Sequence, residues 1–287
     1  MNNICNVINV QCVYGSDNVK HIEDCVIPNL KNMSKNYKIR FLTLNYEKTG
    51  VNIKSGVRYG VEVVDVANDN FMQRGFADNH NYLFNCLEKT DNFILMNPDC
   101  IPLENSIDLL LELKSKNVAI VEGCQWPYEH PKDYNTRTFE TAWASGAFQL
   151  IDSKFYEKIG GMDPIYFLYN EDVDLSWQAW LNGYRVLYNP NAKIIHFTNG
   201  YYEREDVISN ERYYLYRNYI VLMTKFFGKD AEKKALYEVK ESVSKELYEV
   251  IINDYEKIRP LISDKYVGKF HKYVKVYGLG LYAKHRW

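Results

Sequence analysis

The sequence predicts an α/β protein in which a mostly parallel central sheet is flanked by helices. Two observations support this prediction. Segments with the composition of strands alternate with segments of helical spacing through the N-terminal half, an order typical of parallel βαβ units. The chain also has 287 residues, of which 46% are hydrophobic, enough for one large domain with an appendage.

The N-terminal half begins with a strand that ends in the turn-forming cluster Tyr14–Asn18. Pro28 lies inside the first predicted helix and is expected to kink or divide it. We expect strands at 5–13, 38–44, 61–66 and 93–96, and helices at 21–33, 76–87 and 107–113.

The C-terminal half continues with a long segment, 123–141, that shows no clear periodicity. Long connections in compact domains are usually functional. Gly160 and Gly183 each follow a predicted helix, where glycine commonly ends one. Strands are expected at 118–121, 148–151 and 192–195, and helices at 153–159, 171–181, 211–227 and 230–258.

Three carboxylates, Glu171, Asp172 and Asp174, crowd the first turn of the predicted helix 171–181. The helix dipole favours acids at a helix N-terminus, which accounts for one or two of them. They follow an aromatic run, 166–169, whose composition suits the lining of a pocket. Asp172 and Asp174 are separated by about 200° around a helix, so both cannot face one pocket.

Two further acids lie at the ends of predicted strands. Asp99 follows the apolar strand 93–96, and α/β folds bind ligands at the carboxyl ends of parallel strands. The sequence Asn97-Pro98-Asp99 also suits an Asx–Pro turn. Asp65 lies near the end of strand 61–66, where a ligand contact and a plain loop acid are both compatible with the sequence.

Composition excludes several classes of function. Lys and Arg number 35 against 37 Asp and Glu, so we expect no general affinity for nucleic acids. The six cysteines form no C-x-x-C pair and no zinc-ligand spacing. We find no signal peptide and no run of about 18 apolar residues, which predicts a cytoplasmic protein without a membrane-spanning helix.

The end of the chain is basic and aromatic. From Lys257 onward, eight Lys and Arg residues occur with one acid, Asp264, and six aromatic residues lie among them. Two interpretations stay open for this segment. It is either a solvated helical face or a peripheral contact with the anionic inner face of a membrane.

Five sequence elements follow one another between Trp143 and His196. They are S-G-A (145–147), G-G-M-D (160–163), F-L-Y-N-E-D-V-D-L-S-W (167–177), G-Y-R (183–185) and a strand that ends in His196. In this combination the chain resembles the inverting, family-two glycosyltransferases of the GT-A fold, and among them the rhamnosyltransferase-like members. The resemblance implies a single GT-A-like domain at 1–227, with a donor half (about 1–105), an acceptor half (about 106–227) and a helical C-terminal extension at 228–287.

The resemblance further implies a nucleotide-sugar donor, a UDP-, GDP- or dTDP-sugar, bound by the first half. Positions matching the family's donor contacts are Tyr14, Arg74, Asn97 and Asp99, and Asp65 is a further candidate for a contact with the base or ribose. Arg74 belongs to a segment similar to the family's N-x-G-F-A, at a helix N-terminus that suits a diphosphate. Asp99 and His196 match ligands of a divalent cation, Mn²⁺ or Mg²⁺, with Asn97 in the first position of the family's D-x-D.

On the acceptor side, the resemblance makes Asp172 the general base. Trp143, Ser145, Gly146 and Glu171 match acceptor-binding positions. The loop 123–141 is expected to contribute the aromatic side chains of Trp126, Tyr128 and His130. The implied function is metal-dependent, inverting transfer of a sugar to a glycan or lipid-linked saccharide in polysaccharide biosynthesis.

Two other functions remain compatible with the sequence: a sugar nucleotidyltransferase of similar fold, and a non-catalytic carbohydrate-binding relative. Nucleotidyltransferases favour a Gly-rich, basic phosphate loop, which Tyr14–Asn18 does not provide. The presence of both Asp99 and Asp172 disfavours a non-catalytic relative. A dinucleotide-binding dehydrogenase is disfavoured because no G-x-G-x-x-G follows the first strand.

Overall fold

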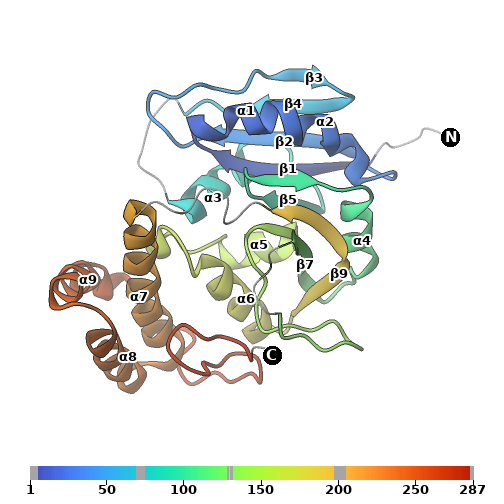
Figure 1. Ribbon diagram of the computed structural model, residues 1–287. Helices are drawn as coiled ribbons and strands as arrows, with labels where there is room; N and C mark the ends of the chain where they lie inside the picture. Colours follow the sequence, from blue (N-terminus) through green and yellow to red (C-terminus); the bar gives the residue numbers. More distant parts are fainter. Residues whose placement is uncertain (1–5, 69–74, 128, 130–131, 197–204, 285–287) are drawn as a thin grey trace.

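The computed structural model describes residues 6–68, 75–127, 129, 132–196 and 205–284. Within these residues, nine strands form one sheet in the order β3-β4-β2-β1-β5-β8-β7-β9-β6 (Figure 1). The strands are β1 (Val7–Tyr14), β2 (Lys38–Asn45), β3 (Gly56–Arg58), β4 (Val61–Asp65), β5 (Asn92–Met96), β6 (Cys100–Pro102), β7 (Val118–Pro127), β8 (Phe148–Asp152) and β9 (Arg185–His196).

The α/β class is confirmed, although the sheet is mixed rather than mostly parallel. β4, β2, β1 and β5 run parallel to one another, as the βαβ pattern predicts. β8 lies antiparallel between β5 and β7, and the edge strands β3 and β6 are antiparallel to their neighbours. The central strands are apolar runs buried on both faces. The prediction of a mostly parallel sheet failed because the composition of a buried strand does not indicate the direction of the neighbouring strand.

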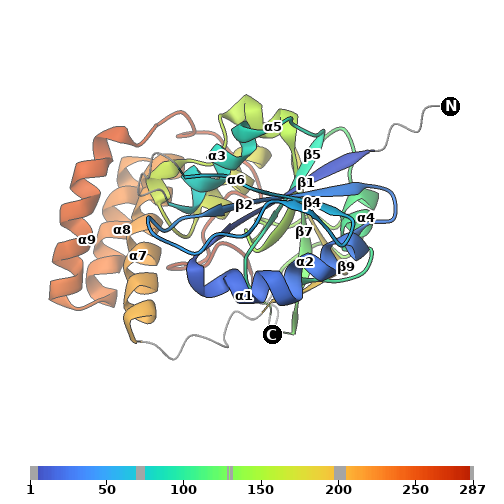
Figure 2. The same cartoon turned by 90° about the horizontal axis from the view of Figure 1, so that it is seen from above.

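Helices cover both faces of the sheet (Figure 2). α1, α2 and α4 share one hydrophobic cluster with β1 and β5, whereas α3, α5 and α6 belong to a second cluster on the opposite face. α7, α8 and α9 lie together at one end of the molecule. The helices are α1 (Val19–His21), α2 (Ile27–Leu30), α3 (Phe76–Cys86), α4 (Ser106–Glu112), α5 (Ser153–Ile159), α6 (Glu171–Leu181), α7 (Glu205–Phe227), α8 (Lys229–Ser242) and α9 (Lys245–Ile258).

Two predicted helices differ from the structure. The segment 230–258 forms two helices, because the chain is extended at Val243 and the Ser244 side chain caps α9 by accepting a backbone hydrogen bond at 3.3 Å. The first helical segment continues through Pro28, but it widens to π-type hydrogen bonding over Ile22–Val26. Proline has no backbone N–H to donate, so regular hydrogen bonding is interrupted close to it.

The predicted loop 123–141 begins later than expected. β7 extends beyond the predicted strand 118–121 as far as Pro127, and its outer part pairs with β9 after a shift in register. The short strands β3 and β6 were not predicted, since three residues are too few to show a period.

The C-terminal helices pack on the rest of the molecule, because their buried residues share one hydrophobic cluster with α5 and α6. The last segment, 262–284, is not helical. Tyr266, Val274 and Tyr282 are buried in it, while Phe270 is 89% exposed. The helical extension is thus confirmed for α8 and α9 and wrong for this segment, and the boundary at 227 stays a prediction. No helix in the described parts of the chain combines the length and hydropathy that crossing a membrane requires.

Candidate active site

Asp65 ends β4 and is partly exposed. Its Oδ1 accepts hydrogen bonds from the hydroxyls of Tyr14 (2.9 Å) and Thr43 (2.6 Å). Burial raises the pKa of Asp65, and these two hydrogen bonds oppose the rise. Tyr14 is fully buried, and its hydroxyl also accepts a hydrogen bond from Ile53 N (2.9 Å). The Tyr14 ring is therefore covered and its hydroxyl helps to position Asp65, while its contact with a donor stays a prediction.

Asp99 and His196 lie together at the ends of β5 and β9. His196 Nε2 is 3.2 Å from Asp99 Oδ1. β6 pairs with β9 so that Cys100 lies opposite His196, and the ligand atoms of all three residues fall within 4.8 Å of one another. Carboxylate and imidazole are both common ligands of divalent transition-metal ions.

Gln125 fixes the orientation of the His196 ring. Gln125 Oε1 is 2.7 Å from His196 Nδ1, and an amide oxygen can only accept, so Nδ1 carries the proton. The lone pair of Nε2 then faces the Asp99 carboxylate at 3.2 Å, and both groups are suited to bind one metal ion. Metal-binding histidines are usually held through their other nitrogen in this way. The residues present therefore fit a divalent metal ion.

The turn Ser145–Ala147 connects this region with α6. The carbonyl oxygen of Ala147 accepts a hydrogen bond from Asn97 N (2.9 Å). The preceding residue, Gly146, donates its N–H to Asp172 Oδ2 (3.1 Å). One turn thus touches the Asn97–Asp99 element on one side and Asp172 on the other.

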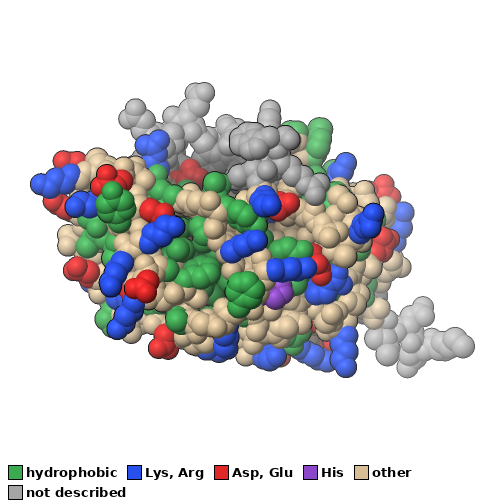
Figure 3. Space-filling model, turned by 90° about the horizontal axis from the view of Figure 1, so that it is seen from below, with side chains coloured by type: hydrophobic (Ala, Val, Ile, Leu, Met, Phe, Trp, Pro, Cys, Tyr) green, Lys and Arg blue, Asp and Glu red, His purple; other side chains and the backbone are tan. Residues whose placement is uncertain are grey.

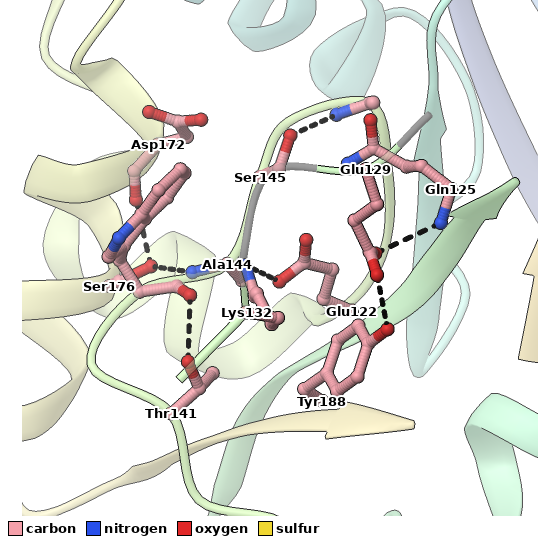
Figure 4. A network of polar contacts seen from close by, with 12 residues as sticks. Glu122, Gln125, Glu129, Lys132, Thr141, Ala144, Ser145, Asp172, Ser176 and Tyr188 are labelled. Atoms are coloured by element: carbon pink, nitrogen blue, oxygen red, sulfur yellow. Dashed lines mark hydrogen bonds and ion pairs between the residues drawn. The ribbon is translucent and has the colours of Figure 1, made fainter. Parts of the chain in front are cut away.

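Asp172 lies in the first turn of α6 and is partly exposed (Figure 4). Burial raises its pKa, and the N–H groups of Gly146 and Val173 and the ammonium of Lys132 oppose that rise. Asp172 Oδ1 accepts a hydrogen bond from Val173 N at 2.8 Å. A carboxyl with a raised pKa is a better proton acceptor than an exposed Asp, and the three opposing groups favour its ionised form.

The two neighbouring acids have different surroundings. Glu171 is 5% exposed, and burial together with the charge of Asp172 raises its pKa well above the ordinary value. Its Oε2 has no hydrogen-bond partner among the described residues. Asp174 is fully buried and contacts the Tyr166 hydroxyl (2.7 Å) and Lys225 Nζ (2.6 Å). The prediction that Asp172 and Asp174 face different ways is confirmed.

The residues that precede α6 adopt an uncommon backbone conformation. Phe167, Tyr169 and Asn170 have φ values of 61°, 67° and 70°. Such values cost on the order of 1–3 kcal/mol in a residue other than glycine, and they persist where the surrounding structure holds them. Asn218 on α7 provides that hold, because its Nδ2 lies 2.7–2.9 Å from three carbonyl oxygens of this loop. α7 thereby positions the loop that leads into Asp172.

A buried ion pair lies near Asp172 (Figure 4). Glu122 on β7 is fully buried and pairs with Lys132, whose side chain is 8% exposed. Lys132 Nζ is 4.4 Å from the centre of the Trp143 ring, a cation–π contact. Burial raises the pKa of Glu122 to about 7, and Lys132 opposes the rise. This pair was not predicted from the sequence. The available signal was Glu122 itself, an acid that directly follows the apolar run 118–121.

The remaining predicted residues are more scattered. The Ser145 hydroxyl accepts a hydrogen bond from the backbone two residues further on (3.3 Å). Trp126 lies on β7 and is 52% exposed. Arg74, Tyr128 and His130 lie outside the described residues.

The fold is that of GT-A glycosyltransferases, as the likeness to two solved structures shows. A mannosyltransferase from Pyrobaculum calidifontis, solved with GDP-Man and Mn²⁺, is similar at a TM-score of 0.58 and 10% identity, over 90% of this chain and 81% of its own. GalNAc-T7, solved with UDP, GalNAc and Mn²⁺, is similar at a TM-score of 0.59 and 12% identity, over 89% of this chain and 55% of its own. At these identities the likeness shows the fold alone.

No family model matches the chain. A stretch of 54 residues is 37% identical to an N-acetylglucosaminyl-diphospho-decaprenol L-rhamnosyltransferase of Mycobacterium tuberculosis, covering 19% of this chain and 18% of that protein. A stretch of 57 residues is 35% identical to the rhamnosyltransferase WbbL of Escherichia coli, covering 20% and 22%. The chain thus matches about a fifth of the length of either relative. The resemblance to rhamnosyltransferase-like proteins of the GT-A fold is confirmed by these stretches together with the fold.

Proposed function

We propose that this protein is a glycosyltransferase that moves a sugar from a nucleotide-sugar donor to a hydroxyl group of an acceptor. The observation that carries the proposal is the Ser145–Ala147 turn, which contacts the element bearing Asp99 on one side and Asp172 on the other. Sugar transfer needs a site for the departing diphosphate and a base for the attacking hydroxyl. In this GT-A fold, the turn lies between Asp99, the candidate for the diphosphate site, and Asp172, the candidate for the base.

Donor binding falls to Asp65, Asn97, Asp99 and Arg74. Asp65 is the candidate for a contact with the base or ribose, since it is partly exposed and held by buried neighbours. Asp99 and His196 would hold Mn²⁺ or Mg²⁺, which is supported by their 3.2 Å separation and by the Mn²⁺ in both structural neighbours. When bound, such an ion offsets the negative charge that develops on the departing diphosphate.

Asp172 is the proposed base. Its carboxylate takes the proton of the acceptor hydroxyl while the hydroxyl oxygen bonds to the anomeric carbon and the diphosphate leaves. The Gly146 N–H holds one oxygen of this carboxylate, which limits its rotation. A single base opposite the leaving group implies one displacement, and hence inversion at the anomeric carbon.

Trp143, Ser145, Gly146 and Glu171 form the proposed acceptor side. The raised pKa of Glu171 favours its protonated form, which can donate a hydrogen bond to an acceptor oxygen. Its unpartnered Oε2 is available for such a contact. The Trp143 ring, fixed against Lys132, offers a flat apolar face of the kind that sugars pack on.

The proposed acceptor is a glycan or a lipid-linked saccharide, used in polysaccharide biosynthesis on the cytoplasmic side of a membrane. The support is the match, over 19% of this chain, to a relative whose name includes a diphospho-decaprenol acceptor.

The segment 262–284 suits a peripheral contact with an anionic membrane. Figure 3 shows Lys and Arg side chains around hydrophobic ones on the face seen from below. Phe270 is 89% exposed and Val267 42%, and they alternate with Lys265 and Lys269. Each Lys near an anionic surface contributes roughly 1 kcal/mol. In flotation assays we expect binding to anionic liposomes at low salt that high salt reverses, and absence of binding at low salt would remove this part of the proposal.

A donor panel tests the proposed function as a whole. The release of nucleoside diphosphate is measured from UDP-, GDP- and dTDP-sugars, with and without Mn²⁺. We expect one donor class to be turned over and Mn²⁺ to be required. Pyrophosphate release from a nucleoside triphosphate and a sugar phosphate would identify a nucleotidyltransferase instead, and binding of sugars without any turnover would identify a carbohydrate-binding protein.

A further inference from the structure

A cavity of about 150 Å³ lies between the C-terminal segment 262–284 and the stretch 133–142. Its C-terminal wall includes Lys272, Tyr273, Lys275 and Tyr277, and its opposite wall includes Asp133. A water molecule occupies about 30 Å³ in the liquid, so the cavity has room for one small polar group with its waters, though not for a whole saccharide.

The cavity carries an excess of positive charge. Lys272 Nζ is 3.7 Å from Glu140 Oε2, but Glu140 is already paired with Arg185 (3.1 Å). Lys275 makes no ion pair within the described residues, and its Nζ lies 5.0 Å from the centre of the Tyr277 ring. Asp133 is the one acid among the lining residues, which include the two lysines Lys272 and Lys275. Such a balance favours an anionic guest.

Two of the lining residues are chain neighbours of aromatic residues that belong to the candidate acceptor side or pack on α6. Ala142 belongs to the lining and directly precedes Trp143 in the chain. Ala283 belongs to the lining as well and directly follows Tyr282, whose ring packs edge-on against Trp177 of α6 at 5.7 Å.

We propose that this cavity binds an anionic group, a phosphate or a carboxylate, carried by the acceptor, so that the C-terminal segment selects acidic acceptors. The identity of the guest as an acceptor rests on the proposed glycosyltransferase function. The binding of an anion between Lys272 and Lys275 does not depend on it.

Site-resolved labelling of lysines tests the anion site itself. The full chain is acetylated in EDTA, which prevents phosphate from binding through a metal at Asp99, with inorganic phosphate or with galacturonate as the probe. We expect one probe to slow labelling of Lys272 and Lys275 severalfold while Lys245 and Lys257, exposed lysines of α9, keep their rates. The effective probe distinguishes a phosphate guest from a carboxylate guest, and equal rates at all four lysines with both probes would overturn the proposal.

A paired variant tests the link to the acceptor. Lys272→Gln/Lys275→Gln is compared with the control Lys245→Gln, using a sugar phosphate, a uronic-acid saccharide and a neutral saccharide as acceptors. We expect the KM for the acidic acceptor to rise about tenfold, the scale of losing a hydrogen bond to a charged group, with the neutral acceptor and donor hydrolysis by water unchanged. An equal effect on acidic and neutral acceptors contradicts acceptor selection. Absence of donor turnover in the unmodified chain would refute the proposed function and leave the labelling result standing.

Discussion

The donor side and the acceptor side of the candidate active site hold their carboxylates in different ways. Asp65 is the last residue of β4 and Asp99 lies three residues beyond the end of β5, so the backbone of the parallel half of the sheet places them. Asp172 lies on a helix whose preceding loop has three left-handed residues, and it depends on contacts with Gly146, 26 residues away, and Asn218, which holds the loop from α7.

This difference separates the effects expected of substitutions. Changes around Asp99 should act on metal and donor binding, because the ends of the strands alone position that part of the site. Changes in α7 or near Lys132 should act on turnover. Asn218 on α7 holds the loop that leads into Asp172, and Lys132 lowers the pKa of Asp172.

The largest effect is expected for Asp172→Asn. Loss of a general base typically costs ~10²–10⁴ in rate, so turnover should fall by at least ~10² while donor affinity stays close to that of the unmodified chain. Asp174→Asn is no control here, because Asp174 is buried against Lys225. Turnover and donor titration by calorimetry give the two values, and a variant nearly as fast as the unmodified chain would show that Asp172 is not the base.

Gln125→Leu is expected to weaken metal binding by roughly 10–100-fold, the range for losing the group that orients a histidine ligand. The reason is the 2.7 Å contact between Gln125 Oε1 and His196 Nδ1. Gln125→Glu keeps an acceptor for the Nδ1 proton and should retain most of the affinity. Mn²⁺ titration followed by electron paramagnetic resonance measures both variants, and equal affinities for Leu and Glu would remove Gln125 from the metal site.

Asn218→Ala should lower turnover by about tenfold and leave donor affinity unchanged. This is less than the ~10² expected when a catalytic group is misplaced by an ångström. It removes the amide that holds the left-handed loop, and the net loss of stability is about 1–4 kcal/mol for up to three hydrogen bonds. Asn210→Ala, an exposed position on the same helix, is the matched control. Urea unfolding run beside the kinetics separates the two effects, and a loss of stability without a change in turnover contradicts the positioning role.

The smallest effect is a shift in pH dependence. Lys132 lowers the pKa of Asp172, so removing its charge should raise that pKa and move the acid limb of the turnover profile to higher pH. A base must be deprotonated, hence activity falls as pH falls through this pKa. Glu122→Gln/Lys132→Met avoids leaving a buried carboxylate unpaired, and Lys132→Arg keeps the charge. The other titratable groups that interact with Asp172 are Glu171 and the Tyr282 hydroxyl, both unchanged in these variants. A profile that stays in place in the double variant contradicts the coupling.

The sequence predicted those parts of the molecule whose signal is local. The apolar strands that end at Asp65 and near Asp99 and the helix that begins at Glu171 are present within a few residues of their expected bounds. Helix geometry also separated Asp172 from Asp174 correctly, since 3.6 residues per turn needs no tertiary information.

Features that depend on distant contacts could not be predicted. Tyr14 is at the expected strand end, but its burial against Asp65 arises from packing between β1 and β4 across β2. Lys132 lies in a polar stretch without periodicity, so nothing in the local sequence indicates its pairing with Glu122. Likewise, the break between α8 and α9 at Ser244 lies inside one continuous apolar stripe.

The most direct test measures donor affinity and turnover side by side for Asp99→Ala and Asp172→Asn, with circular dichroism to confirm that both variants fold. We expect Asp99→Ala to lose Mn²⁺-dependent donor binding. Asp172→Asn should bind the donor as the unmodified chain does but lose turnover. The unmodified chain should give a product of inverted anomeric configuration. Turnover by Asp99→Ala in EDTA at a rate close to that of the unmodified chain, or product with retained configuration, would contradict these expectations.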